Sequence, residues 1–575
     1  MPNYLRGGFL FSTAVLTACC LPASANVIVS NAATQNMNCS AGICAPTAAS
    51  ATLNVSDLEN FLASGNVEIA TTGTGVQAAN ITIDGKLSWS SASTLALVAY
   101  GSVSVNKPVS VKGAGGFSVV TDVGVMNGEF SFGPGGNLAF ANLSGQLSIN
   151  NAPYMLVSSV ASLAAAVTAN PTGRFALANK YDASKDGIYA TSPIATTFTG
   201  WFEGLGNTIS NLSINDPVDD SSVGLFAVSQ GTLANVRLAN INVTGASGSS
   251  DDSTEYVGGL VGCACWSGMI WNSSVSGVVS GGTYAGIGGL AGVASGGTVA
   301  SSSSNVSVSS GSESAAGSLV GLTSQETVTD SFASGNVSGG GTLGLGGLVG
   351  QNTGKIEHSH ATGTVTATDD AAYVGGLVGF NLSGTVSKSY AAGGVECQGK
   401  AACGGLVGFQ AFALQGAEMI ERSFATGPVT SNGGAGGLVG YAQVGTISDS
   451  YATGSVSAPL AGGLIGENTN NDGYHSVENS YSSGVVTGSA GETGGLIGND
   501  ESKSTIKRAY WDTTTSGITD KGQGAGNVAN DPGIKGLSNT KLESRLPDGF
   551  NPKVWAESPA INGGLPYLIA NPPPK

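Results

Sequence analysis

The chain has 575 residues, and its 21 Lys+Arg against 37 Asp+Glu give a formal net charge of -16. Charged residues make up 10% of it, whereas an ordinary globular domain has about 25%. The acidic balance argues against sequence-independent nucleic-acid binding and against docking on anionic lipid, because both need a basic surface. With 90 glycines and three histidines, the chain is rich in turn-forming residues and poor in groups for acid–base chemistry.

The N-terminus has the features of an export signal. Gly7 to Leu21 is an apolar run, and Ala23-Ser24-Ala25 supplies the small residues that signal peptidase accepts. We therefore expect a signal peptide over residues 1–25 and an exported chain, secreted or held at the outer cell surface. A lipoprotein cleavage site ending at Cys19, which would then carry a lipid anchor, is the alternative. No later segment has the ~20 unbroken apolar residues of a membrane helix, so we expect no transmembrane span.

Residues 26–155 alternate apolar and polar side chains in short runs, which predicts irregular coils of a β-helix. Ser56-Asp57-Leu58-Glu59 resembles a capping box that opens one or two helical turns.

Residues 156–257 are expected to contain a helix over Leu156–Ala169 and then the opening coils of a repeat array. Residues 511–575 are expected to form a loop and a cap, with a short helix over Ser538–Leu546. A segment covering the last coil would protect an exposed strand edge.

An internal repeat organises residues 258–510. The pentapeptide Gly258-Gly259-Leu260-Val261-Gly262 recurs, with small variations, at intervals of 30, 29, 29, 29, 29, 32, 26 and 32 residues. A second block, seen at Ile447 to Val456, follows each well-preserved copy. Each unit consists of short apolar runs separated by Gly, Asn, Ser and Thr, which is typical of strands and turns. A unit this short cannot bury its apolar face alone, whereas stacked copies can.

These features predict an all-β fold, a parallel β-helix (solenoid) with short capping helices. Coils stacked ~4.8 Å apart would place equivalent side chains above one another. The leucines of the pentapeptides would then form one internal column: Leu260, Leu290, Leu319, Leu348, Leu377, Leu406, Leu438, Leu464 and Leu496.

Two further columns follow from the same register. Stacked rings are expected from Phe332, His360, Tyr390, Phe424, Tyr451, Tyr481 and Tyr510. A ladder of amides is expected from Asn352, Asn381, Gln410 and Asn468.

A charged stripe is the candidate binding surface. Stacking would align polar residues along one corner of the helix, and two interpretations remain open. They are a solvated face with compensating ion pairs, or a groove for a glycan or a partner protein. The candidate residues are Asp330, Glu357, His358, Lys388, Glu421, Arg422, Asp449, Glu478 and Arg508.

Metal and catalytic motifs are sparse in the sequence. We expect no cofactor. The pairs Asp219-Asp220, Asp251-Asp252 and Asp369-Asp370 could bind Ca²⁺ weakly, although acidic turns are the simpler interpretation. There is no HExxH and no GxSxG motif. Among the cysteines, Cys39–Cys44 and Cys397–Cys403 could close short loops, whereas the spacing of Cys263 and Cys265 would strain a bridge within an extended strand.

The repeated pattern GGLVGxNxGxIxxSYATGxV resembles the GLUG repeat of large secreted bacterial surface proteins, which also occurs beside M26-type immunoglobulin A1 peptidases. Leu53 to Thr121 is more distantly similar to the strand repeats of filamentous-haemagglutinin-like exoproteins. The resemblance implies a β-helical, surface-exposed or secreted protein and brings no defined active site.

We therefore expect a non-enzymatic, adhesin-like protein that presents an extended face to glycans, matrix or cells. Two alternatives remain. One is a β-helical carbohydrate-active enzyme, a polysaccharide lyase or hydrolase. The other is a structural segment of a larger secretion or biofilm system. Surface display would require a separate translocator protein.

Overall fold

The computed structural model describes residues 25–124, 127–250, 255–368, 373–411, 419–469, 476–501 and 506–574. Residues 1–24 of the predicted signal peptide, which include Cys19, lie outside these residues, as do Asp251-Asp252 and Asp369-Asp370. The chain divides into two compact units. Unit 1 comprises residues up to Gly136 together with Ser148–Ala152, and unit 2 comprises Asn137–Leu147 and Pro153 onward.

Unit 1 is built from short parallel strands in stacked coils. One sheet has the order β14-β11-β8-β1-β4 and another contains β5, β10 and β13. Along these strands buried and partly exposed residues alternate, as in β1, because one face packs into the core. The strands are β1 (Asn26–Ser30), β4 (Ala51–Asn54), β5 (Val67–Ala70), β8 (Asn80–Ile83), β9 (Leu87–Trp89), β10 (Thr94–Val98), β11 (Val103–Val105), β12 (Val109–Val111), β13 (Gly116–Val120) and β14 (Phe130–Phe132).

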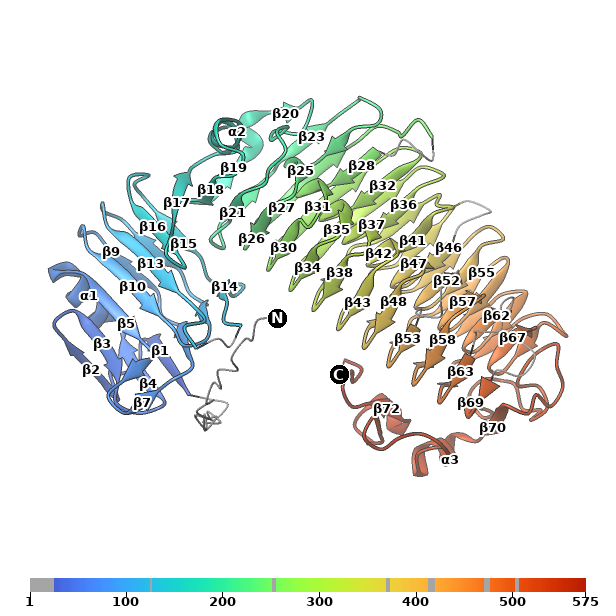
Figure 1. Ribbon diagram of the computed structural model, residues 1–575. Coiled ribbons are helices and arrows are strands. Elements are labelled where there is room, and N and C mark those ends of the chain that lie inside the picture. The colour runs from blue at the N-terminus through green and yellow to red at the C-terminus, as the bar shows by residue number, and fades with distance from the viewer. Residues whose placement is uncertain are drawn as a thin grey trace, which may run out of the picture. The chain divides into compact units, whose positions relative to one another are not determined.

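Unit 2 is a parallel β-solenoid, so the predicted fold class is confirmed (Figure 1). One coil shows the plan: β41 (Gly344–Gly346), β42 (Val349–Asn352), β43 (Lys355–Glu357), β44 (His360–Ala361) and β45 (Val365–Ala367). Each strand pairs with its equivalents in the coils on either side, which generates four columns of strands.

The four columns are named here by their place in the coil. Column 1 precedes the leucine turn and contains β28 (Glu255–Gly258), β32 (Ala285–Gly288), β36 (Ala315–Gly317), β41, β46 (Tyr373–Gly375), β51 (Ala402–Gly404), β56 (Gly434–Gly436), β61 (Leu460–Gly462) and β66 (Thr493–Gly494). Column 2 follows that turn and contains β29 (Val261–Ala264), β33 (Ala291–Ser295), β37 (Val320–Ser324), β42, β47 (Val378–Leu382), β52 (Val407–Ala411), β57 (Val439–Ala442), β62 (Ile465–Asn468) and β67 (Ile497–Asp500).

Columns 3 and 4 complete each coil. Column 3 contains β21 (Trp201–Glu203), β26 (Thr232–Ala234), β30 (Met269–Trp271), β34 (Thr298–Ala300), β38 (Thr327–Thr329), β43, β48 (Thr385–Ser387), β53 (Met419–Glu421), β58 (Thr446–Ser448), β63 (Ser476–Glu478) and β68 (Ile506–Lys507). Column 4 contains β31 (Ser274–Ser280), β35 (Ser303–Ser310), β39 (Phe332–Ala333), β40 (Val337–Gly339), β44, β45, β49 (Tyr390–Ala391), β50 (Val395–Cys397), β54 (Phe424–Ala425), β55 (Val429–Ser431), β59 (Tyr451–Ala452), β60 (Val456–Ser457), β64 (Tyr481–Ser482), β65 (Val486–Thr487), β69 (Ala509–Asp512) and β70 (Ile534–Leu537).

The pentapeptide leucines form a continuous column inside unit 2. All nine side chains are fully buried. Each leucine N–H from Leu260 to Leu464 donates to the carbonyl of the next leucine in the series, at 2.8–3.0 Å. The same residue thus supplies both a core side chain, worth roughly 1.5–3 kcal/mol, and an inter-coil hydrogen bond.

The glycines of the pentapeptide are required by close backbone contacts. A β-carbon at Gly346 would lie 1.9 Å from the Val349 carbonyl oxygen, and one at Gly350 would lie 2.5 Å from the Ala316 nitrogen. No real β-carbon approaches backbone atoms so closely, so any side chain here would push strands of columns 1 and 2 apart.

The helices lie near the predicted places with corrected boundaries. Helix α1 spans Val55–Ser64 and is capped by Asn54, whose Oδ1 accepts the N–H of Ser56 at 2.8 Å, so the predicted capping box at Ser56 is wrong. Helix α2 spans Val160–Ala169, because residues before Ser159 continue strand β17 (Ala152–Val157). Helix α3 is Asn539–Ser544.

The C-terminal region, expected to form a loop and a cap over residues 511–575, continues the edge of the last coil through its loop, in which Gly524 accepts the N–H of Leu496 at 2.9 Å. Residues 538–574, named here the C-terminal strap, instead pack along the side of the solenoid. Phe550, Trp555 and Leu568 of the strap share a hydrophobic cluster with the rings of column 4.

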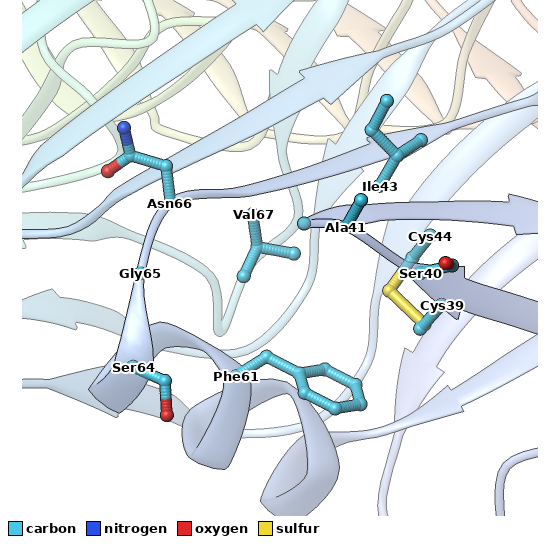
Figure 2. A pocket seen from close by; sticks show the side chains of 11 residues that line it. Cys39, Ser40, Ala41, Ile43, Cys44, Phe61, Ser64, Gly65, Asn66 and Val67 are labelled. Atoms are coloured by element: carbon cyan, nitrogen blue, oxygen red, sulfur yellow. A yellow bond between two sulfur atoms is a disulfide. The ribbon is translucent and has the colours of Figure 1, made fainter.

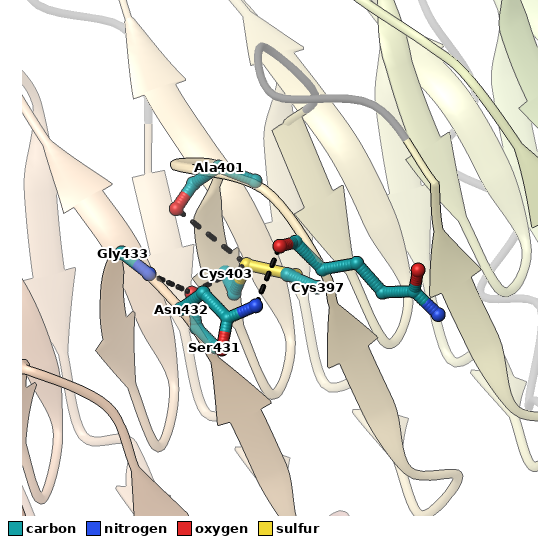
Figure 3. Close-up of a disulfide and its surroundings, with 7 residues drawn as sticks. Cys397, Ala401, Cys403, Ser431, Asn432 and Gly433 are labelled. Carbon is teal, nitrogen blue, oxygen red and sulfur yellow. Dashed lines mark hydrogen bonds between the residues drawn. A yellow bond between two sulfur atoms is a disulfide. The ribbon is translucent and has the colours of Figure 1, made fainter.

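Three disulfides join neighbouring cysteines. Cys39–Cys44 closes the hairpin of β2 (Met37–Ser40) and β3 (Ile43–Pro46). Cys397–Cys403 closes the loop between β50 and β51, beside Ser431 of the next coil (Figure 3). Cys263 in β29 and Cys265 directly after that strand form the third pair, with their Cα atoms 5.3 Å apart.

The amide ladder is present but interrupted at Ala442. Asn352 donates to Asn381 and Asn381 donates to Gln410, both at 2.7 Å. In the next coil the register position is Ala442, and Asn468 follows it. Gln410 Nε2 and Asn468 Oδ1, a buried donor and a buried acceptor, consequently find no partner among the described residues.

Replacing Ala442 by Asn should therefore complete the ladder. The new amide would accept from Gln410 and donate to Asn468, and we expect a gain of about 1 kcal/mol in unfolding free energy. Urea unfolding of wild type and Ala442→Asn measures it. Ala452→Asn, which places the same amide at an inward alanine of column 4, should destabilise; equal losses from both variants would refute the ladder argument.

Leu377→Asp should disrupt the array, because it leaves an unpaired carboxylate in the leucine column. We expect a loss above about 4 kcal/mol, whereas Asp449→Ala, at an outer corner, should cost about 1–2 kcal/mol and keep the fold. Thermal unfolding followed by circular dichroism compares the two variants, and equal melting temperatures would contradict the assignment of inner and outer faces.

Candidate functional site: the corner and ring columns of unit 2

The predicted charged stripe lies at the corner between columns 3 and 4, and every corner residue has left-handed backbone geometry. Their φ angles fall between 44° and 52°. This backbone conformation costs free energy for residues with a β-carbon and is best tolerated by Asn and Asp. The backbone geometry therefore accounts for part of the polar composition of the corner. The corner residues are Asn272, Ser301, Asp330, His358, Lys388, Arg422, Asp449, Asn479 and Arg508.

A serine ladder directly follows the corner, and the sequence analysis missed it. Each serine hydroxyl donates to the carbonyl two residues earlier at 2.8–2.9 Å. From Ser302 onward each hydroxyl also accepts the N–H of the serine one coil earlier, at 3.1–3.2 Å, and the first, Ser273, accepts the N–H of Val236. The serine directly before each stacked ring from Phe332 to Tyr481 was the available signal. The members are Ser273, Ser302, Ser331, Ser359, Ser389, Ser423, Ser450 and Ser480, all buried.

The charges of the stripe pair with one another in two clusters. Glu357 contacts Lys355 and Lys388, the latter at 3.0 Å, and His358 lies 3.8 Å away. Hydrogen bonds from Lys355 and Lys388 lower the pKa of Glu357 to about 2. Glu478 contacts Arg508 at 3.1 Å and Lys507 at 3.8 Å. These are the compensating ion pairs of one of the two interpretations.

The remaining stripe residues have different surroundings. Asp330 accepts a hydrogen bond from the Thr329 hydroxyl at 2.9 Å. Glu421 is half-buried at the end of β53, where its carbonyl accepts from the N–H of Lys388. Arg422 and Asp449 contact the C-terminal strap. The stripe is therefore several local environments and not one uniform groove.

The ring column of column 4 is stacked as predicted. From Phe332 to Tyr481, consecutive ring centroids lie 4.6–5.2 Å apart and the ring planes are within 7° of parallel. Burial changes sharply along it: Phe424, Tyr451, Tyr481 and Tyr510 are buried, whereas Phe332 is 43% exposed. His360 and Tyr390 are half-buried.

The strap accounts for this change in burial. Trp555 lies 5.9 Å from the Tyr451 ring and 6.0 Å from the Tyr481 ring, and its indole N–H donates to Asp449 Oδ1 at 3.0 Å. The Tyr481 hydroxyl donates to the Pro566 carbonyl at 2.6 Å. Near the end of the strap, the Asn571 amide donates to the carbonyls of Ser389 and Arg422 at 3.2 Å. The strap thus covers the column from Phe424 onward.

A second ring column lies on the outer side of column 2 and was not predicted. Phe380, Phe409 and Tyr441 stack at 5.3 and 4.8 Å, and Tyr373 lies 4.6 Å from Phe409. Phe380, Phe409 and Tyr441 each follow the last glycine of a pentapeptide directly, which is the signal that could have revealed the column.

Metal binding has limited support in the geometry. Asp219 and Asp220 accept backbone N–H groups of Ser247 and Ser249, at 3.2 and 2.8 Å, so these carboxylates stabilise the adjacent turn. Within the part of the chain that the structure describes, no three His, Cys, Asp or Glu side chains converge as metal ligands. No helix among the same residues is long and apolar enough to cross a membrane.

Unit 1 has a cavity of about 430 Å³ beside the Cys39–Cys44 hairpin (Figure 2). Phe61 at the end of α1, Ile43 of the hairpin and Val67 of β5 line it. Phe61 and Ile43 are 40% and 50% exposed, so the cavity is a mainly apolar hollow of the surface.

Two buried carboxyl groups in unit 2 also escaped sequence reasoning. Glu203 accepts the N–H of Leu205 at 3.1 Å, yet burial raises its pKa to about 8. Glu326 accepts the N–H of Gly297 at 2.6 Å, and burial raises its pKa to about 7. They lie in different coils, so each carboxyl group is a separate titrating site.

Comparison with known proteins supports the predicted repeats. The GLUG motif matches residues 341–366 and 431–457, so the chain carries GLUG repeats at these two places. A "Putative Gly-rich membrane protein" of Evansella cellulosilytica is 38% identical over 87 residues, which are 14% of this chain. The chain thereby spans about a tenth of the length of that curated relative.

Glu203 should make stability depend on pH. The pKa of Glu203 is about 8 in the folded state, against an ordinary value of 4.5. Its contribution to the unfolding free energy is therefore fully present below pH 4.5 and is lost as the pH rises through 8. We expect wild type to lose about 4 kcal/mol relative to Glu203→Gln between pH 5 and pH 8. Melting temperatures of both proteins at the two pH values measure this. Glu396→Gln, an exposed site, is the control, and parallel pH profiles for wild type and Glu203→Gln would contradict the prediction.

Proposed function

We propose that this chain is an exported, non-enzymatic, adhesin-like β-solenoid that presents an extended face for contact with glycans, matrix or cells. The observation that carries the proposal is the part of the ring column before Phe424, where Phe332 is exposed and His360 and Tyr390 are half-buried. It lies beside a corner with carboxylate and ammonium groups. Aromatic rings next to charged and hydrogen-bonding groups are the elements from which surfaces for sugars and proteins are built.

The repeat supports an extended contact surface and not a single pocket. The same ring, corner and serine positions recur in successive coils at a ring spacing of 4.6–5.2 Å. A linear polymer or a long protein segment can make equivalent contacts at several coils at once, so weak contacts add together.

The charge arrangement also favours contact over catalysis. Glu357 and Glu478 are held in ion pairs. Glu203 and Glu326, two buried carboxyls with raised pKa, lie in different coils. Glycoside hydrolysis usually requires two carboxyl groups facing one substrate bond. A carbohydrate-active enzyme is therefore the alternative that polymer turnover in the experiment below would reveal.

Location at the cell surface is part of the proposal. The apolar leader and the disulfides fit export to an oxidising compartment. The similarity to a "Putative Gly-rich membrane protein" fits association with the cell envelope. Surface display by this chain would use a separate translocator, and incorporation in a larger secretion or biofilm system is compatible with the same face.

The experiment is a glycan and matrix-protein array probed with residues 26–575. We expect binding that falls at least tenfold in the double variant Phe332→Ala/Tyr390→Ala, because it removes the uncovered rings. Ile188→Ala, which removes a side chain 71% exposed elsewhere in unit 2, is the matched control. Turnover of pectin- or alginate-like polymers by the same preparation would overturn the non-enzymatic assignment. Equal binding by the double variant would overturn the assigned face.

A further inference from the structure

The strap shows which chemistry the ring column accepts. Trp555 sets its indole against the rings of two adjacent coils and gives its N–H to the corner carboxylate of the first coil, Asp449. Polar groups of the strap bond to the ring column and its surroundings: the Pro566 carbonyl accepts from Tyr481, and the Asn571 amide donates to the carbonyls of Ser389 and Arg422. An indole, a carbonyl and an amide on one folded segment, in which Trp555 pairs with Leu568, are therefore recognised together.

The same arrangement is repeated, uncovered, at the other end of the ring column. Asp330 is the other aspartate of the left-handed corner, with φ of 50° against 46° for Asp449. Phe332 stands two residues after Asp330, as Tyr451 does after Asp449, and His360 supplies the ring of the next coil, 5.2 Å away. Both rings belong to the continuous register that leads to Tyr451 and Tyr481.

The two positions differ in what covers them. The Tyr451 ring is fully buried, whereas 43% of Phe332 is exposed. His360 replaces Tyr481, whose hydroxyl donates to the strap. Burial lowers the pKa of His360, so its ring is neutral at pH 7 and offers one N–H donor and one acceptor nitrogen. The uncovered position thus keeps the carboxylate, the paired rings and a polar ring atom.

We propose that Asp330, Phe332 and His360 form a docking site for a tryptophan-bearing segment of a partner protein, which binds as the strap binds at Asp449. This inference rests on the proposed contact function and names its partner as a polypeptide. The indole of the partner packs against Phe332 and His360, and its N–H donates to the Asp330 carboxylate.

A partner protein is favoured over a second copy of this chain. The strap of each molecule is already docked on its own ring column, where the tether gives it a high effective concentration. A strap from another molecule would have to leave those contacts first. The docking site is continuous with the strap's own surface, so a foreign segment with the same groups meets the same register of rings and corners.

The test uses a fluorescein-labelled peptide of residues 546–574 as the probe. It is titrated with the chain of residues 26–575 and followed by fluorescence anisotropy. We expect saturable binding that Asp330→Asn and Phe332→Ala each weaken at least tenfold, while Ile188→Ala leaves it unchanged. The same peptide with Trp555→Ala should bind at least tenfold more weakly to the wild-type chain. Both chain variants alter exposed groups, and circular dichroism verifies their fold.

Three outcomes would overturn the proposal. One is the absence of saturable binding, or equal affinity for wild type and both chain variants. Another is loss of hydrogen-exchange protection at residues 555–571 of the chain on peptide addition, which would mean that the peptide displaces the strap. The third is concentration-dependent self-association that Trp555→Ala in the chain abolishes, which would make a second copy the occupant. Glycan binding on the array without peptide binding would reject this inference and leave the proposed contact function standing.

Discussion

The structure of unit 2 depends on one constraint: equivalent residues of successive coils must lie directly over one another so that their backbones pair. The nine pentapeptide leucines satisfy it most completely, because each is both core and hydrogen-bond partner of the next. The close contacts at Gly346 and Gly350 are the consequence, since strands of columns 1 and 2 approach to distances that exclude a β-carbon. An inward side chain cannot be changed in one coil without affecting the coils on both sides.

The same constraint shapes the surface. Each coil turns at a residue with positive φ, so Asn, Asp and other polar residues collect at one corner and carry their charges into register. Opposite charges of neighbouring coils then pair, as Glu357 does with Lys388. Rings at equivalent positions of successive coils stack. Their apolar surface is either covered by another part of the chain or exposed to a binding partner. The strap covers the column from Phe424 to Tyr510, and the remaining rings are the surface available for contact.

Comparison of particular residues shows where sequence reasoning succeeded. The leucine, ring and amide columns could be predicted because repeat spacing alone fixes register, and register alone fixes which side chains stack. The left-handed geometry of the corner was not foreseen, since Lys388 and Arg422 carry no sequence mark of positive φ. The break of the amide ladder at Ala442 was readable in the sequence, whereas the two unpaired atoms it leaves depend on side-chain placement.

The sequence by itself determined the class of fold, the order of the columns and the inner face, because a period near 29 residues with fixed apolar positions admits one stacking register. Only the tertiary structure decided where the C-terminal strap docks, since Trp555 and Asp449 lie 106 residues apart and no periodicity relates them. It alone divided the ring column into a covered and an open part. Burial at Glu203 was likewise decided in three dimensions, because the local sequence around that carboxyl group does not reveal which elements exclude water from it.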